Sequence, residues 1–232
     1  MFGKRFHLLT LLGFEVNVDL SWFLLAFLLA WSLAQGYFPA VIPDLPPGTA
    51  LWLALAGTIG VFASIVFHEF AHALVARKFD MPVSGITLFL FGGVAHLCEE
   101  PPSARAEFFM AIAGPIASFS LALGFYVLLF VLFTGEAGRP LAALVAYFAT
   151  INLVLATFNL IPAFPLDGGR VLRAAIWAWT GNLDRATRVC TFLGRGLGLA
   201  LMVVGIAGIV TGDFAGGFWL GLIGFFIVAG MG

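Results

Sequence analysis

The stretch VFHEFAHALVAR, residues 66–77, places two imidazoles and a carboxylate in an apolar run that is typical of a helix buried in lipid. His68 and His72 are four residues apart, so both rings leave one face of a helix. Two imidazoles at this spacing can hold one Zn²⁺, and Glu69 can act as a base on a water that the metal activates. The alternative is a chance pair of hydrogen-bonded histidines, but ionisable groups inside apolar helices are functional by default. The stretch therefore predicts a metal site within a membrane.

The composition of the whole chain is that of an integral membrane protein. Of its 232 residues, 62% are hydrophobic and 10% are charged, whereas a soluble domain carries about a quarter charged residues. Apolar runs near 20 residues long, separated by short polar segments, predict helices that span a bilayer. The net charge of -1 gives no indication of nucleic-acid binding. The two cysteines, Cys98 and Cys190, do not form a disulfide framework, and we expect both to be reduced structural residues.

The apolar runs predict an all-α membrane protein with six transmembrane helices. The predicted spans cover residues 20–36, 50–78, 105–134, 140–163, 191–211 and 214–231. Ten of the eleven Lys and Arg residues then lie on one side of the membrane, and only Arg139 lies on the other. The positive-inside rule makes the crowded side cytoplasmic, so both termini are expected in the cytoplasm of a multi-pass protein of the cell membrane. No cleavable signal peptide is predicted, and the first span is expected to be a permanent anchor.

Two stretches are not typical of spanning helices. Residues 6–19 alternate apolar and polar side chains around Gly13, which indicates a short strand or hairpin. Residues 82–97, PVSGITLFLFGGVAHL, are rich in strand-forming side chains, with a turn or bulge at Gly92 and Gly93. Non-helical backbone at membrane depth is tolerated only against protein or a water-filled cavity. The sequence therefore predicts a small β-strand or hairpin element near the cytosolic side of the metal site.

A catalytic zinc site needs a third protein ligand. Asp167 stands out among the acidic residues, in the stretch NLIPAFPLDGGR at 159–170. Pro162 and Pro165 must break the preceding helix, and unwound backbone of this kind lines cavities in membrane proteins. An ordinary turn at the end of a span would also contain Asp and Gly, but beside an incomplete HExxH site we expect Asp167 to be a ligand. Other candidates for this position are a thiol, another carboxylate, His7 and His96.

The two motifs together resemble those of the site-2 protease family of intramembrane zinc metalloproteases. Members share a helix with HExxH and a later one with N-x-x-P-x-x-x-L-D-G, which this chain matches from Asn159 to Gly168. The segments FGG at 91–93 and AGP at 113–115 are also similar to family features. The resemblance covers nearly the whole chain and implies a compact prokaryotic-type member without a PDZ domain. In many members the AGP segment runs on to an asparagine where this chain has Ser118, which argues against a role of the third span in the site.

The resemblance implies a single intramembrane protease domain over residues 1–232, which hydrolyses peptide bonds within or near the transmembrane segments of membrane-protein substrates. Its cofactor would be Zn²⁺, and its nucleophile a water activated by the zinc. The implied site consists of the metal ligands His68, His72 and Asp167, the catalytic base Glu69 and the substrate-binding residues Asn159, Gly92 and Gly93. Some members carry a cytosolic CBS-pair domain, so the resemblance is compatible with a soluble C-terminal regulatory domain outside this chain. A homo-oligomer is a further alternative.

Two other classes of function compete with this interpretation. A metal-binding transporter or channel would use the same His, Glu and Asp cluster to line an ion path, and broken helices at the midplane suit transporters as well. The chain has no evident internal repeat, however, and its last two predicted spans are almost free of ionisable residues. A catalytically inactive relative that only binds transmembrane helices would not need Glu69. We therefore expect a protease.

Overall fold

The computed structural model describes residues 5–89, 92–97, 100–132 and 138–230. It is mainly helical, and within these residues five helical stretches are long and apolar enough to cross a membrane, as expected for a multi-pass membrane protein. They are Leu20–Val41, Pro47–Lys78, Ala104–Val131, Arg139–Asn159 and Leu183–Val210. The sixth predicted span corresponds to helix α8, Phe214–Ala229, which has only 16 residues. Six spans are therefore not confirmed.

The boundaries of several spans, among them those of α5 and α7, differ from those expected. Helix α5, Arg139–Asn159, ends before the predicted residue 163, because Pro162 cannot continue a helix. Helix α7, Leu183–Val210, begins before the predicted residue 191. Its first turns are polar, and Asn182 caps them by accepting a hydrogen bond from the backbone N–H of Arg185. A prediction of spans detects runs of apolar residues, so it does not include the polar first turns of α7.

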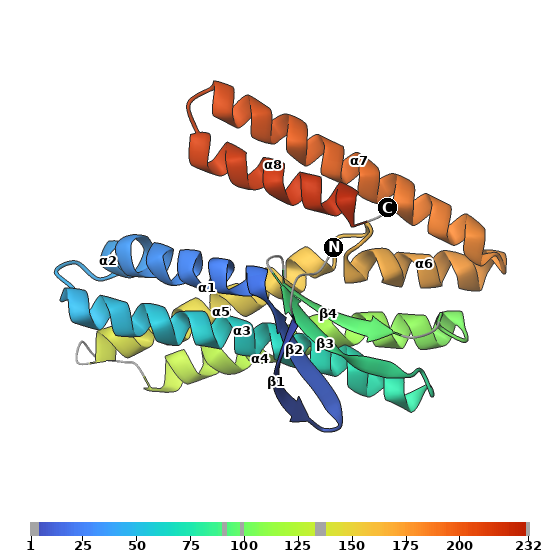
Figure 1. Cartoon of the computed structure of the whole chain (residues 1–232), viewed down its shortest axis with the longest axis horizontal. Coiled ribbons are helices and arrows are strands. Elements are labelled where there is room, and N and C mark those ends of the chain that lie inside the picture. Colours follow the sequence, from blue (N-terminus) through green and yellow to red (C-terminus); the bar gives the residue numbers. More distant parts are fainter. Residues whose placement is uncertain (1–4, 90–91, 98–99, 133–137, 231–232) are drawn as a thin grey trace. The chain divides into compact units, whose positions relative to one another are not determined.

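The chain forms two compact units, which are described separately (Figure 1). The first comprises residues 1–100 and 113–156, and the second comprises residues 101–112 and 157–232. The long helix α4, Ala104–Leu132, contributes its first turns to the second unit and the rest to the first.

The first unit contains a four-stranded sheet in the order β1-β2-β3-β4. Strands β1 and β2 form an antiparallel hairpin, β2 pairs in parallel with β3, and β3 pairs antiparallel with β4. Both predicted non-helical stretches are thus confirmed as pairs of strands. Their bounds are β1 Arg5–Leu11, β2 Phe14–Asp19, β3 Val83–Phe89 and β4 Gly92–Leu97.

The sheet packs against the part of helix α3, Pro47–Lys78, that carries the HExxH motif. Phe70 and Ala73 of α3 form a buried cluster with residues of β2 and β3. Arg77, near the end of α3, donates a hydrogen bond of 2.7 Å to Leu12 O in the hairpin turn and lies 4.0 Å from the ring centre of Phe14. At 3.6 residues per turn, Phe70 lies on the opposite side of α3 from His68. The cluster with β2 and β3 therefore lies on the face of α3 away from His68.

The remaining helices of the first unit are α1, Leu20–Ser32, a π-helical turn Leu33–Tyr37, α2, Phe38–Val41, and α5. A buried apolar cluster joins α3 and α5 to the π-helical turn and α2. One polar link also connects α3 and α5, since the buried Asn152 Nδ2 donates to Ser64 Oγ at 2.9 Å. Ser64 lies one turn before His68, so this link lies next to the HExxH motif of α3.

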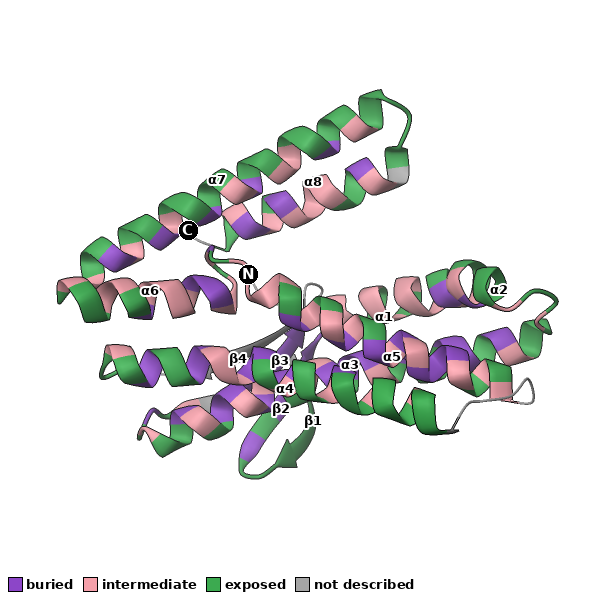
Figure 2. Ribbon diagram, turned by 180° about the vertical axis from the view of Figure 1, so that it is seen from behind, coloured by how far each residue is buried: buried purple, intermediate pink, exposed green. Residues whose placement is uncertain are grey.

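The second unit contains α6, Asp167–Thr180, followed by α7 and α8. Helices α7 and α8 run side by side, and much of the outer surface of α7 is exposed (Figures 1 and 2). Their backbones approach closely at glycines: a Cβ added at Gly205 would lie 2.6 Å from Gly217 O. Small residues permit such close packing between helices in a membrane. Helix α6 was not predicted, because its apolar residues lie between arginines.

Candidate functional site

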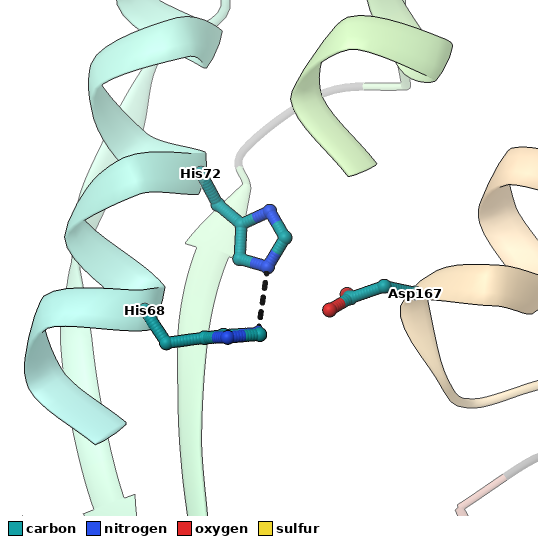
Figure 3. A group of neighbouring side chains, drawn as sticks. All are labelled: His68, His72 and Asp167. Atoms are coloured by element: carbon teal, nitrogen blue, oxygen red, sulfur yellow. Dashed lines mark hydrogen bonds between the residues drawn. The ribbon is translucent and has the colours of Figure 1, made fainter. Parts of the chain in front are cut away.

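His68 and His72 lie on one face of α3 and their rings point toward one another (Figure 3). The two Nε2 atoms are 3.2 Å apart, and both residues are buried, with exposed fractions of 3% and 8%. Two zinc–nitrogen bonds of about 2.05 Å at a tetrahedral angle would hold two nitrogens about 3.3 Å apart. The observed separation fits this distance. The imidazole pair that the sequence predicts therefore has the geometry of two ligands of one tetrahedral ion.

Ser118 of α4 fixes the orientation of the first imidazole. His68 Nδ1 and Ser118 Oγ are 2.9 Å apart, and the serine is fully buried. A metal-bound Nε2 would have to keep its lone pair, and Nδ1 would then carry the proton and donate to the hydroxyl. Such a partner sets the tautomer and the ring plane of a metal-binding histidine. The departure at Ser118 weakens the expectation of a site role for the third predicted span, whereas in the structure this serine contacts the first predicted ligand.

Gly114, in the AGP segment of α4, leaves space beside both imidazoles. A Cβ added there would contact His72 Nε2 and would lie 2.5 Å from His68 Nε2. Both contacts are far closer than van der Waals contact, so a larger residue at this position would require the imidazoles to move. The space that glycine leaves is next to the two lone pairs. An ion can occupy it, and the donor set of two imidazoles suits zinc.

The predicted third ligand, Asp167, is the first residue of α6 in the second unit, and it is half-buried. The turn before it contains a cis peptide bond between Phe164 and Pro165. Gly168 packs closely against this turn, since an added Cβ would lie 2.5 Å from Ile161 O. The prolines and glycines of the motif thus end α5 and begin a new helix with the carboxylate in its first turn. Figure 3 draws this carboxylate with the two imidazoles.

The other predicted site residues also lie within the described part of the chain. Glu69 follows His68 on α3 and is half-buried, and Asn159 is the half-buried last residue of α5. Gly92 and Gly93 begin β4 and pair with Phe89 and Leu88 of β3. His7, another candidate ligand, lies on the exposed strand β1 and forms a hydrogen bond of 2.9 Å with Thr10.

Comparisons with known proteins agree with the sequence motifs. A sequence profile described as "Peptidase family M50" matches residues 56–137 and 134–204. The chain is 39% identical over 217 residues to "Putative zinc metalloprotease Rip3" of Mycobacterium tuberculosis, which covers 94% of this chain and 55% of that protein. It is also 39% identical over 223 residues to "Putative zinc metalloprotease sll0528" of Synechocystis, which covers 96% of this chain and 58% of that protein. The chain thus spans little more than half the length of these relatives.

A solved structure has a similar fold. The "Site-2 Protease from Methanocaldococcus jannaschii" superposes with a TM-score of 0.66 at 26% sequence identity, over 98% of this chain and 94% of that one. The match over nearly the full length of both chains means that the overall fold is similar. The profile, the relatives and this structure all point to the family that the paired motifs resemble.

Proposed function

The chain belongs to peptidase family M50, and from this membership we propose that it is a zinc-dependent intramembrane endopeptidase. It would hydrolyse peptide bonds within or near the transmembrane segments of membrane proteins. The observation that carries the proposal is the buried pair His68 and His72, with Nε2 atoms 3.2 Å apart on an apolar helix long enough to span a membrane. Burial of two imidazoles at this depth is favourable when a cation bridges them.

The proposed metal set adds Asp167 to the two histidines. Two imidazoles and one carboxylate are a common donor set of catalytic zinc, which leaves the fourth position for water or substrate. The relatives named as zinc metalloproteases support this choice of metal. The motif around Asp167 supports its role as well, because its prolines and glycines build a turn that ends on the carboxylate. Bound zinc would lower the pKa of a water molecule to about 7 and polarise the scissile carbonyl.

The protein's own residues carry the proton steps. Glu69 directly follows the first ligand on α3, and it would take a proton from the attacking water and deliver it to the leaving amide nitrogen. The amide of Asn159 would donate a hydrogen bond to the developing oxyanion or to the substrate backbone. Ser118 keeps His68 in the tautomer that binds metal. In each of these roles the side chain acts as a hydrogen-bond donor, an acceptor or a proton carrier of the kind usual for its residue type.

Strand β4 is the proposed place for the unwound substrate. A helical substrate hides its amide groups in its own hydrogen bonds, so the peptide must become extended before hydrolysis. Strand β4 is the last in the sheet order and pairs with β3 along one side. Strand β4 begins at Gly92 and Gly93, and the side of it that faces away from β3 would accept an extended peptide as an added strand. Replacement of both glycines by valine should reduce cleavage of a helical substrate, and unchanged cleavage would contradict this role.

The proposed topology places α8 as a sixth span and both termini in the cytoplasm, because ten of the eleven basic residues then lie on that side. In this arrangement residues 1–232 form one intramembrane protease domain. The partners would be transmembrane protein substrates within the bilayer. The relatives are longer than this chain, and a soluble regulatory domain is a further proposed partner. A second copy of this chain, in a homo-oligomer, is another.

One experiment separates this function from a metal transporter or channel, which family membership does not favour. The purified protein in liposomes should cleave a helical membrane substrate and should lose this activity with EDTA. The Glu69→Gln variant should lose at least about 100-fold in rate, the usual contribution of a general base, and still bind zinc. A protein that moves zinc across the liposome membrane without cleaving the substrate would contradict the protease proposal.

A further inference from the structure

We propose that Glu107 and Arg173 are positioning residues for the metal ligand Asp167. Their ion pair holds the start of α6 in the orientation in which the carboxylate binds zinc. The inference rests on the proposed function, and it assigns a task to two charged residues that the hydrolytic steps do not use. All the contacts that carry it lie within the second unit of the chain.

The ion pair is buried and well formed. Arg173 Nε donates a hydrogen bond of 2.6 Å to Glu107 Oε1, and a second guanidinium nitrogen also contacts this oxygen. The glutamate is fully buried, and the side chain of the arginine is 15% exposed. Glu107 lies in the first turn of α4, where the helix dipole favours a negative charge. Removal of either partner would take away a charge-assisted contact between buried side chains, and this contact links α4 to α6.

Arg173 also contacts the turn that precedes Asp167. Its guanidinium lies 5.3 Å from the ring centre of Phe164, within the range of a cation–π interaction. Phe164 comes three residues before Asp167, and Arg173 comes six residues after it. Arg173 therefore connects α6, which begins with the ligand, to the turn that precedes the ligand. Through Glu107 it ties this segment to a third point, on α4.

The turn and the first turn of α6 are packed as one piece. Leu166 N donates to Ala163 O at 3.0 Å, and Gly169 N donates to Leu166 O at 3.0 Å. A Cβ added at Gly169 would lie 2.6 Å from Phe164 N. Because these backbone segments are in contact, a displacement of Phe164 or of α6 would also displace Asp167. The ion pair thus acts on the ligand through a short and densely packed segment.

The start of α6 and its contact with α7 also differ in kind from the ion pair. Its N-cap is Leu166, which provides no side-chain hydrogen bond to the first turn. Helices α6 and α7 contact each other, and their buried residues include Ala174 on α6 and Ala186 on α7. Apolar contacts between small side chains are non-directional. The hydrogen bond from the guanidinium to Glu107 Oε1, by contrast, is charge-assisted and depends on distance and angle, and a metal ligand must be held to about 0.5 Å.

Zinc affinity of the purified full chain, measured by competition with a chromogenic chelator, tests the proposal. Glu107→Gln and Arg173→Lys should each weaken zinc binding by roughly 10–100-fold, the usual effect of removing a residue that orients a ligand. The visible absorption of the Co²⁺-loaded protein should shift as well, because it reports the ligand geometry. Arg185→Gln, which alters an exposed arginine on α7, is the matched control and should bind zinc like the wild type.

A double-mutant cycle with Asp167→Ala distinguishes positioning from general stability. If the ion pair acts through the carboxylate, Glu107→Gln should not weaken zinc binding further in the Asp167→Ala background. Equal weakening in both backgrounds, or lower thermal stability with unchanged zinc affinity, would overturn the inference. If Glu107→Gln does not fold, Arg173→Lys replaces it in the double-mutant cycle, because lysine keeps the positive charge. An Asp167→Ala protein with wild-type zinc affinity would instead contradict the proposed metal set itself.

Discussion

An added methyl group at Gly114 tests the position of the metal most directly. In Gly114→Ala the new Cβ would contact His72 Nε2 and would lie 2.5 Å from His68 Nε2 and 2.6 Å from His72 Cε1. A carbon needs about 3.5 Å to a non-bonded heavy atom, and zinc needs about 2.05 Å to each nitrogen. The methyl group and the ion would therefore occupy the same space. Zinc affinity should fall by more than about 100-fold, beyond the usual effect of losing an orienting partner.

The assay compares thermal unfolding of the purified protein with zinc and with EDTA. Zinc at 100 times its Kd should stabilise the wild type by about 2.7 kcal/mol, and most of this increment should disappear in Gly114→Ala. Gly124→Ala is the matched control on the same helix, because no heavy atom lies within 4 Å of the added Cβ. The control should keep the zinc effect and gain up to about 1 kcal/mol from helix propensity. A Gly114→Ala protein with wild-type zinc affinity would show that the ion does not bind between these imidazoles.

Three further substitutions test single contacts. Ser118→Ala should weaken zinc binding about 10-fold, because the hydrogen bond that sets the tautomer of His68 is lost. Ser118→Asn should restore part of the zinc affinity, as measured by chelator competition. Ser64→Ala removes the acceptor of Asn152 between α3 and α5 and should cost about 0.6 kcal/mol, a decrease of about 2 °C in Tm; an unchanged Tm would mean that this link contributes nothing. Gly205→Ala should destabilise the α7–α8 pair by about 1–3 kcal/mol through backbone overlap, whereas Gly196→Ala, in open space on α7, should not.

Much of the fold and of the candidate site follows from local patterns. The family resemblance and the membrane character are confirmed, and both non-helical stretches are strands, because alternation around Gly13 and β-branched chemistry are local signals. The end of α5 and the start of α7 were missed, since the cap at Asn182 and the short helix α6 carry polar residues that an apolar window does not detect. The role of Ser118 was missed because a lone serine 50 residues from its partner gives no signal.

The amino-acid sequence by itself determined that the chain is a membrane protein and which residue types are available for metal chemistry. These properties depend on composition and on the spacing of His68 and His72 within one helix, and helical periodicity alone brings their rings together. Only the tertiary structure decided which groups from other segments complete their surroundings. Ser118 orients one imidazole, and Gly114 leaves the space beside both. Contacts between segments distant in the sequence depend on how the helices pack, and packing depends on all the side chains of an interface at once, which no single motif encodes.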